Sequence, residues 1–180
     1  MLIRAADPSR DGAACAALYA PFVRETAVSF EEEPPTAAAM ADRIARVWRK
    51  YPWLVAERGG ELAGYAYAVE HRSRPAYRWA ADVAVYVASG HRRVGVARSL
   101  YDRLLAALAC QGIHSACAGI TLPNPASVAL HESLGFELVG VYRRIGFKAG
   151  AWRDVGWWQR ELLAAGAQAP DHPRAPAAQQ

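Results

Sequence analysis

The stretch of sequence that decides the fold is His91–Tyr101, "HRRVGVARSLY". It follows residues 79–87, "WAADVAVYV", whose alternation of apolar and polar positions predicts a β-strand. After it, apolar residues recur at helical spacing and predict a helix that ends near Gly112. These apolar positions are Val96, Leu100, Leu104 and Leu108. The chain therefore passes from a strand into a helix through a short turn of small and basic residues.

Such a turn is suited to an anionic ligand, because the first N–H groups of a helix have no partner within the helix. Gly95 and Ala97 allow a diphosphate to approach the backbone, and arginine side chains can add charge-assisted hydrogen bonds. The turn matches neither the Gly-Lys-Ser/Thr of a P-loop nor the G-x-G-x-x-G of dinucleotide-binding proteins. From these residues alone, a phosphate site and an ordinary surface loop are equally good interpretations.

Composition and charge indicate a globular protein with some preference for anions. A chain of 180 residues with 53% hydrophobic and 21% charged residues is expected to form one domain. The net charge of +4 comes almost wholly from arginine, since Lys50 and Lys148 are the only lysines. The arginines are dispersed, and no run of five like charges indicates nucleic-acid binding.

The cysteines and the N-terminal segment favour a cytoplasmic protein. Cys15, Cys110 and Cys117 are odd in number and lack metal-type spacing, so we expect reduced thiols and no metal. The first residues, "MLIRAADPSRDG", do not have the pattern of a signal peptide. The apolar segment 13–23 is too short to span a bilayer and is expected to be one face of a helix.

The remaining pattern alternates helices and strands, which predicts an α/β or α+β class with a mixed sheet. Before the turn we expect a strand at 2–6, a helix capped by Asp7 or Ser9, a helix capped by Thr36, and a hairpin of strands 53–57 and 61–70. After it we expect a helix to Gly112, a strand at 113–121, a helix within 122–136 capped by Asn124, and strands at 137–143 and 154–162. Residues 1–163 then form one domain, and the Ala/Pro/Gln-rich residues 164–180 form a tail that is expected to be disordered.

Two motifs resemble the signatures of the GNAT superfamily of N-acetyltransferases. The first is Arg92, Val94, Gly95 and Ala97 with their spacers, and the second is the helix from Asn124 that closes in Gly135-Phe136. Within the superfamily, the sequence is most similar to the phosphinothricin and methionine sulfoximine N-acetyltransferases. The most specific block is residues 146–159, "GFKAGAWRDVGWWQ", and the likeness extends over residues 2–162.

The resemblance implies the GNAT fold, a mixed, mostly antiparallel central sheet flanked by about four helices. It implies that strand residues Val85–Val87 splay from the neighbouring strand and pair with the pantetheine arm of acetyl-CoA, whose pyrophosphate is bound by the turn. The implied cofactor-binding residues are Val85, Tyr86, Val87, Arg92, Arg93, Val94, Gly95, Val96, Ala97, Arg98 and Asn124. The group is usually homodimeric, and it implies no metal, nucleic-acid or membrane partner.

The resemblance also assigns catalytic positions to Asp82 and His131. Asp82 falls where the group usually has glutamate, so its carboxylate reaches about 1.5 Å less far and a bridging water is more necessary. His131 falls where the group has histidine and many wider relatives have a tyrosine that protonates coenzyme A. Without the resemblance, a solvated carboxylate and a satisfied buried histidine are the favoured interpretations.

For the substrate, the resemblance implies a pocket and a basic loop over the amino-acid carboxylate, which an arginine can grip with two hydrogen bonds. The implied substrate-binding residues are Phe30, Arg72, Arg74, Tyr77, Tyr101 and Val155. A solvated loop is the alternative for Arg72 and Arg74. The tryptophans at 152, 157 and 158 are expected to pack in the core or in a dimer.

The expected reaction is transfer of acetyl from acetyl-CoA to the α-amine of a small free amino acid, by direct attack in a ternary complex. Phosphinothricin and methionine sulfoximine represent that substrate class. Two alternatives stay open: the same fold acting on a protein N-terminus, a lysine or a polyamine, and a non-catalytic module that binds acyl-CoA or nucleic acid. A closed pocket argues against the first, and intact Asp82 and His131 argue against the second.

Overall fold

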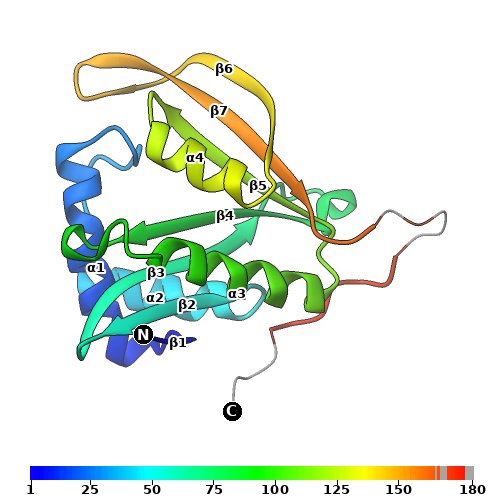
Figure 1. Cartoon of the computed structure of the whole chain (residues 1–180), viewed down its shortest axis with the longest axis horizontal. Coiled ribbons are helices and arrows are strands. Elements are labelled where there is room, and N and C mark those ends of the chain that lie inside the picture. Colours follow the sequence, from blue (N-terminus) through cyan, green and yellow to red (C-terminus); the bar gives the residue numbers. More distant parts are fainter. Residues whose placement is uncertain (165, 167–169, 177–180) are drawn as a thin grey trace.

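A computed structural model describes residues 1–164, 166 and 170–176, and its centre is one seven-stranded sheet (Figure 1). The strand order is β1-β2-β3-β4-β5-β7-β6, and every neighbouring pair is antiparallel except β4 and β5. The strands are β1 Leu2–Ala5, β2 Trp53–Arg58, β3 Glu61–Glu70, β4 Ala80–Val87, β5 Ser115–Leu122, β6 Glu137–Lys148 and β7 Ala151–Glu161. The predicted mixed, mostly antiparallel sheet is confirmed.

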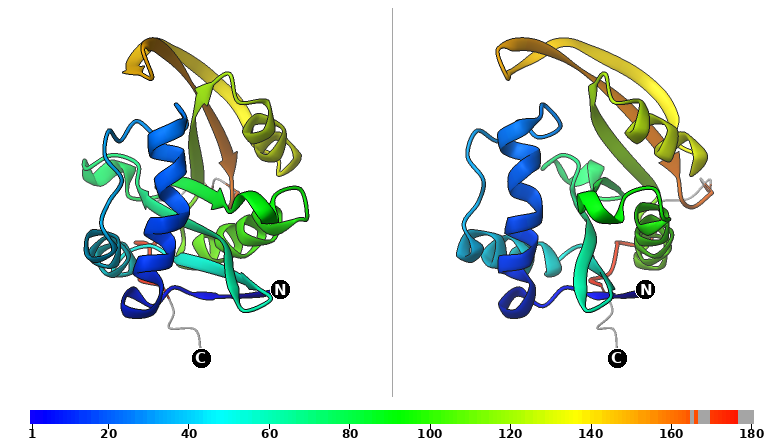
Figure 2. Two further views of the ribbon diagram at one scale, coloured as in Figure 1. Left: turned by 90° about the vertical axis from the view of Figure 1, so that its left-hand side faces the viewer. Right: turned by 60° about the vertical axis from the view of Figure 1, so that its left-hand side comes forward.

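Helices cover both faces of this sheet. They are α1 Pro8–Glu25, α2 Ala37–Trp48, α3 Val96–Gln111 and α4 Pro125–Ser133. Helices α1 and α2 pack on one face, where Met40 and Ile44 meet Trp53. Helix α3 packs on the other face, where Leu100 and Leu104 belong to a second apolar core (Figure 2). Within the described residues, none of the helices is both long enough and apolar enough to cross a membrane.

The helix boundaries follow from the capping residues. Asp7, not Ser9, caps α1, because its carboxylate accepts hydrogen bonds from the backbone N–H groups of Ser9 and Arg10. The Thr36 hydroxyl caps α2 and the Asn124 side chain caps α4. Gly112 ends α3 in the left-handed conformation, with φ at 88°.

The parallel pairing of β4 with β5 is short. Ala80, Ala81 and Asp82 pair with Ser115, Ala116 and Cys117, and the register ends there although both strands continue. Beyond it, β4 remains paired with β3 on its other side, and β5 remains paired with β7. The sheet therefore splays after Asp82, as the resemblance to the GNAT superfamily implies.

The β6–β7 hairpin is longer than the sequence predicts. The expected strands 137–143 and 154–162 are in fact Glu137–Lys148 and Ala151–Glu161, joined through Ala149 and Gly150. Most of β6 is exposed and its register shifts between Tyr142 and Gly146, so no regular apolar alternation marks its second half. The hairpin reaches the loop after α1, where the Lys148 ammonium donates a hydrogen bond to the Glu31 carbonyl oxygen.

Part of the predicted tail lies along the end of α3. The Arg174 N–H donates to the Gln111 carbonyl (2.8 Å), and the Gln111 side chain donates to the Arg174 carbonyl (2.7 Å). The Trp79 indole N–H donates to the Asp171 carbonyl (2.9 Å). Residues 165, 167–169 and 177–180 lie outside the described residues, so the expected disorder of 164–180 and the boundary at 163 stay predictions.

Helices α1 and α2 approach each other at Gly12, which gives a test of the fold. A Cβ at Gly12 would lie 2.8 Å from the Ala41 Cβ and 3.0 Å from the Ala37 carbonyl oxygen. We expect Gly12→Val to lower the free energy of unfolding by about 1–3 kcal/mol, because the helices must separate. Gly90→Ala is the control, since a Cβ there meets nothing within 4 Å. Urea denaturation compares the two, and equal midpoints would contradict the close helix packing.

Candidate active site

The splay between β4 and β5 holds two adjoining cavities that share Val83, Ala84, Gly119 and Thr121 as lining residues. The wider cavity, of about 460 Å³, lies toward the β6–β7 hairpin. Its other lining residues are Phe30, Tyr67, Val69, Asp82, Tyr142, Ile145, Val155 and Trp157. The narrower one, of about 60 Å³, lies toward α3 and α4. Its other lining residues are Val28, Val85, Tyr86, Tyr101, Ala118, Ile120, Asn124, Ser127 and His131.

Asp82 lies in the wider cavity and is hydrogen-bonded to His71. His71 Nδ1 lies 2.6 Å from Asp82 Oδ1, and the side chains are 18% and 25% exposed. Burial raises the pKa of the Asp82 carboxyl above its ordinary value, while the hydrogen bond from His71 and the charge of Arg72 act to lower it. The result is a carboxylate that is more basic than an exposed one, with a fixed orientation.

His131 lies in the narrower cavity and is 3% exposed. Its Nδ1–H donates to the Ser127 carbonyl (2.7 Å), so Nε2 is left to accept from the Tyr101 hydroxyl (3.0 Å). Burial lowers the His131 pKa, which keeps the imidazole neutral near pH 7. The two predicted catalytic residues thus lie at different parts of one opening, and Tyr101 belongs with His131.

The N-terminus of α3 lies in the turn for which the sequence predicts an anion site. Gly95 is its N-cap, with φ at 88° and no side-chain cap, and the first helical hydrogen bond comes from Ser99 N–H to the Gly95 carbonyl. The backbone N–H groups of Val96, Ala97 and Arg98 precede that bond and are free for a ligand. A Cβ at Gly95 would meet nothing within 4 Å, so the backbone is open to a phosphate.

The arginines of the turn have more varied positions than the motif implies. Arg92 packs over the Phe22 ring (5.4 Å to its centroid). Arg98 hydrogen-bonds the Ser133 carbonyl and hydroxyl oxygens, which ties α3 to α4. Arg93 and Val94 are exposed, and Arg93 has a positive φ of 61°. The free backbone amides are therefore the donors that the structure presents most directly.

The predicted pantetheine strand has a backbone edge facing the opening. Val85, Tyr86 and Val87 pair with β3 on one side, while their other side lies beyond the β4–β5 register. The Tyr86 ring packs against Tyr19 at a centroid distance of 4.8 Å, so Tyr86 contributes its backbone to the opening. Asn124 caps α4 and also lines the narrower cavity.

The predicted substrate residues divide into two groups. Phe30 and Val155 line the wider cavity, and Tyr101 lines the narrower one. Arg72, Arg74 and Tyr77 are exposed on the loop after β3 and are not among the cavity's lining residues.

Arg72 is nevertheless adjacent to the wider cavity, because its guanidinium lies 5.8 Å from the ring centroid of the lining residue Trp157.

Sequence reasoning missed two residues of the site, His71 and Trp157. His71 directly follows β3, whose register with β4 places Val69 opposite Asp82. Trp157 is expected to pack, yet it lines the wider cavity, and its indole N–H has no partner among the described residues. The alternation of β7 gave a signal for Trp157, because Val155 shares its face.

The sequence and structure of the chain are similar to those of known acetyltransferases. The model of the acetyltransferase (GNAT) domain matches residues 3–157. The phosphinothricin N-acetyltransferase of Streptomyces viridochromogenes is 43% identical over 141 residues, which cover 78% of this chain and 77% of that protein. The L-methionine sulfoximine/L-methionine sulfone acetyltransferase of Salmonella typhimurium is 36% identical over 163 residues, covering 90% and 95% of the two chains.

A solved structure shows the same fold. It is a GNAT superfamily phosphinothricin acetyltransferase from Sinorhizobium meliloti in complex with AcCoA, with a TM-score of 0.89 and 34% identity. The match covers 94% of this chain and 92% of that one. Together with the splayed sheet and the uncapped α3, these matches show that the chain belongs to the GNAT acetyltransferase family and is an N-acetyltransferase.

Proposed function

We propose that the protein transfers the acetyl group of acetyl-CoA to the α-amine of a small free amino acid of the phosphinothricin or methionine sulfoximine type. The amine attacks the thioester directly while both substrates are bound. The observation that carries this proposal is the pair of adjoining cavities, one with Asp82 and the other with Tyr101 and His131. The similarity to acetyltransferases of both substrates supports the class.

Acetyl-CoA is assigned to the narrower cavity and the turn before α3. The free amides of Val96, Ala97 and Arg98 would bind its pyrophosphate. The open edge of Val85–Val87 would pair with the pantetheine amides, and this aims the thioester at the junction of the cavities. An N–H of the same edge would stabilise the negative charge that develops on the thioester oxygen.

The amine is assigned to the wider cavity, where it must lose a proton before it attacks. An amine whose pKa lies about two units above ambient pH costs roughly 2.7 kcal/mol to deprotonate. Asp82 is the proposed proton acceptor, directly or through a water. His71 occupies its Oδ1, and within the described residues Oδ2 has no hydrogen bond, which leaves that oxygen for the amine.

The departing thiolate of coenzyme A needs a proton, and the proposed donor is the Tyr101 hydroxyl, which His131 Nε2 positions through their hydrogen bond; the hydroxyl regains a proton from solvent before the next turnover. Burial raises the Tyr101 pKa and lowers that of His131, so the hydroxyl keeps its proton and the imidazole is neutral near pH 7. Tyr101 and His131 line the same cavity, and Ser127 fixes the tautomer of His131 through Nδ1. Tyr101 is thereby assigned to the leaving group as well as to the substrate pocket.

The carboxylate of the amino acid is assigned to the loop that carries Arg72, Arg74 and Tyr77. Arg72 lies at the cavity edge beside Trp157. A volume of about 460 Å³ suits a small amino acid better than a peptide. Among the described lining residues, Asp82 is the one acidic side chain, and this disfavours a polyamine.

The homodimer is proposed from the β6–β7 hairpin. Its exposed large apolar residues are Leu138, Val139, Val141, Tyr142, Ile145, Phe147 and Trp152, each at least 40% exposed. A surface of this kind is typical of protein–protein contacts. Nucleic-acid and membrane partners are not part of the proposal, and the cytoplasm is the proposed location because the three thiols are free.

A substrate panel tests the reaction. We expect release of the coenzyme A thiol from acetyl-CoA to saturate with phosphinothricin, methionine sulfoximine or methionine sulfone. Spermidine and a lysine peptide should give at least about 100-fold lower kcat/KM, because the cavity lacks their contacts. Turnover with peptide or polyamine alone would keep the acetyl-CoA site and refute the assignment of the wider cavity.

The pH dependence tests Asp82 and His71. Asp82→Asn should lower kcat/KM by about 100- to 10,000-fold. The base acts when ionised, so kcat/KM rises with pH through its pKa. His71→Phe removes a hydrogen bond that lowers this pKa, so the acidic limb should move to higher pH.

The conservative variant His71→Asn keeps an N–H near Oδ1 and should restore the limb toward the parent value. The titration of the amine itself is common to all variants and cancels in the comparison. A limb that is unchanged in His71→Phe would remove Asp82 from the role of base.

Light scattering on a sizing column tests the dimer. The native chain should elute at twice its mass of 19.5 kDa. The double variant Leu138→Glu and Phe147→Glu should elute as a monomer, because charge replaces apolar contact area. The matched control is Cys110→Glu on the exposed side of α3. A native monomer, or a dimer in the double variant, would contradict the assignment.

A further inference from the structure

We propose that His71, Asp82 and Cys117 form a site for a divalent zinc ion, and that zinc at this site inhibits acetyl transfer. Binding is inferred from the geometry of the three side chains. The inhibition rests on the proposed function, because it follows from the role of Asp82 as the proton acceptor.

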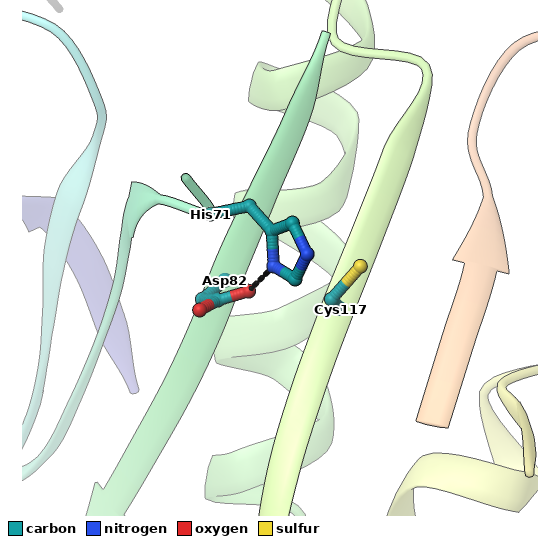
Figure 3. A group of neighbouring side chains, drawn as sticks. All are labelled: His71, Asp82 and Cys117. Atoms are coloured by element: carbon teal, nitrogen blue, oxygen red, sulfur yellow. Dashed lines mark hydrogen bonds and ion pairs between the residues drawn. The ribbon is translucent and has the colours of Figure 1, made fainter. Parts of the chain in front are cut away.

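The sheet brings the three residues together from separate segments. Asp82 and Cys117 are direct partners in the parallel register of β4 and β5, so their side chains leave the same face of neighbouring strands. His71 is the first residue after β3, whose register sets Glu70 opposite Ala81. Figure 3 shows the His71 imidazole between the two strands. The ring is hydrogen-bonded to Asp82 on one side, and Cys117 lies on its other side.

The distances are close to those of a metal site. One ligand atom from each of the three side chains lies within 4.8 Å of the others. Zinc bonds of about 2.0 Å to nitrogen and oxygen and about 2.3 Å to sulfur place tetrahedral ligands about 3.3–3.7 Å apart. The ion would replace the proton between His71 Nδ1 and Asp82 Oδ1, now 2.6 Å apart, and these atoms would separate slightly while the sulfur moves closer.

The donor set selects the metal. Imidazole nitrogen and thiolate sulfur with one carboxylate are typical zinc ligands, whereas magnesium and calcium take oxygen ligands. Three protein ligands leave a fourth position for a water, as in open zinc sites. Because Asp82 lines the wider cavity, that position is accessible from the substrate side.

The thiol is protonated without metal. Burial and the charge of Asp82 raise the pKa of Cys117 to about 11, with Arg72 acting in the opposite direction. A bound zinc ion displaces that proton, because a coordinating thiol is deprotonated by the metal charge. Binding therefore releases the thiol proton, while the proton held between His71 and Asp82 moves to His71 Nε2 so that Nδ1 can bind the ion.

With zinc bound at this position, the Asp82 carboxylate is no longer available to accept a proton from the amine. Asp82 would then coordinate a cation, and a second positive charge would face the incoming ammonium group. We expect inhibition that is competitive with the amino acid, and little change in the binding of acetyl-CoA at the turn before α3.

Cobalt(II) spectroscopy on the untagged full chain tests the site without any activity. One equivalent of CoCl2 should produce a thiolate-to-cobalt charge-transfer band and the intense visible bands of a four-coordinate ion, and one equivalent of ZnCl2 should abolish both. Cys117→Ala should lose the charge-transfer band. The control Cys110→Ser removes an exposed thiol elsewhere and should keep it.

Affinity measurements and a folding control complete the binding test. Loss of a hydrogen-bond partner of a metal ligand weakens metal binding by about 10- to 100-fold. Because His71 is proposed as a ligand itself, His71→Ala should weaken zinc binding by more than that. Circular dichroism confirms that the variants fold, with Cys117→Ser as a second substitution should Cys117→Ala not fold. Absence of the band in the native chain, or its persistence in Cys117→Ala, overturns the site.

Kinetics test the inhibition separately. Micromolar ZnCl2 should raise the apparent KM for the amino acid, chelator should reverse the effect, and Cys117→Ala should be at least about 10-fold less sensitive. If the cobalt bands form but zinc leaves turnover unchanged, the inhibition is wrong and the binding site stands. If no amino acid is acetylated, the proposed function fails while the spectra still decide the metal site.

Discussion

The functional geometry depends on a register of three residue pairs between β4 and β5. Parallel pairing of Ala80–Asp82 with Ser115–Cys117 joins the half of the sheet made by β1–β4 to the half made by β5, β7 and β6. Were the register to continue to the strand ends, the backbone donors of Val85–Val87 would be bonded to β5 and the opening would close. Because this register stops at Asp82, the sheet packs against a core on each face and also has an unpaired strand edge near its centre.

Each chemical group sits where this register places it. Asp82 is the last residue of β4 that pairs with β5, so it lies where the two strands begin to separate, and it lines the wider cavity. Helix α3 follows β4 through a turn and presents its N-terminus near the other end of that strand, while α4 follows β5 and carries His131. Desolvation is the largest cause of both pKa shifts: it raises the pKa of Asp82 and lowers that of His131. A carboxyl becomes more basic and an imidazole stays neutral.

The sequence predicted the parts that follow from local patterns. The helix caps at Thr36 and Asn124, the alternating strand before the turn and the resemblance of the turn to the GNAT motif each depend on residues close in the chain. Phe30, Asp82 and Val155 line one cavity, and their roles stay proposals.

What escaped the sequence depends on contacts between distant segments. His71 gains its importance from Asp82, which is eleven positions away and faces it only through the β3–β4 register. The hydrogen bond between Tyr101 and His131 joins helices α3 and α4, and the spacing of residues along the sequence does not predict such a contact. The second half of β6 is exposed, so burial left no alternation to detect.

The contact between the β6–β7 hairpin and the loop after α1 affects the shape of the wider cavity. Gly146 leaves room for Phe30, since a Cβ there would come within 2.2 Å of the Phe30 ring, and Phe30 in turn lines the wider cavity. One side of the wider cavity is thus built by a loop and a hairpin that carry none of the proposed proton-transfer groups. Substitutions in these two segments would change the shape of the wider cavity while leaving Asp82, Tyr101 and His131 in place.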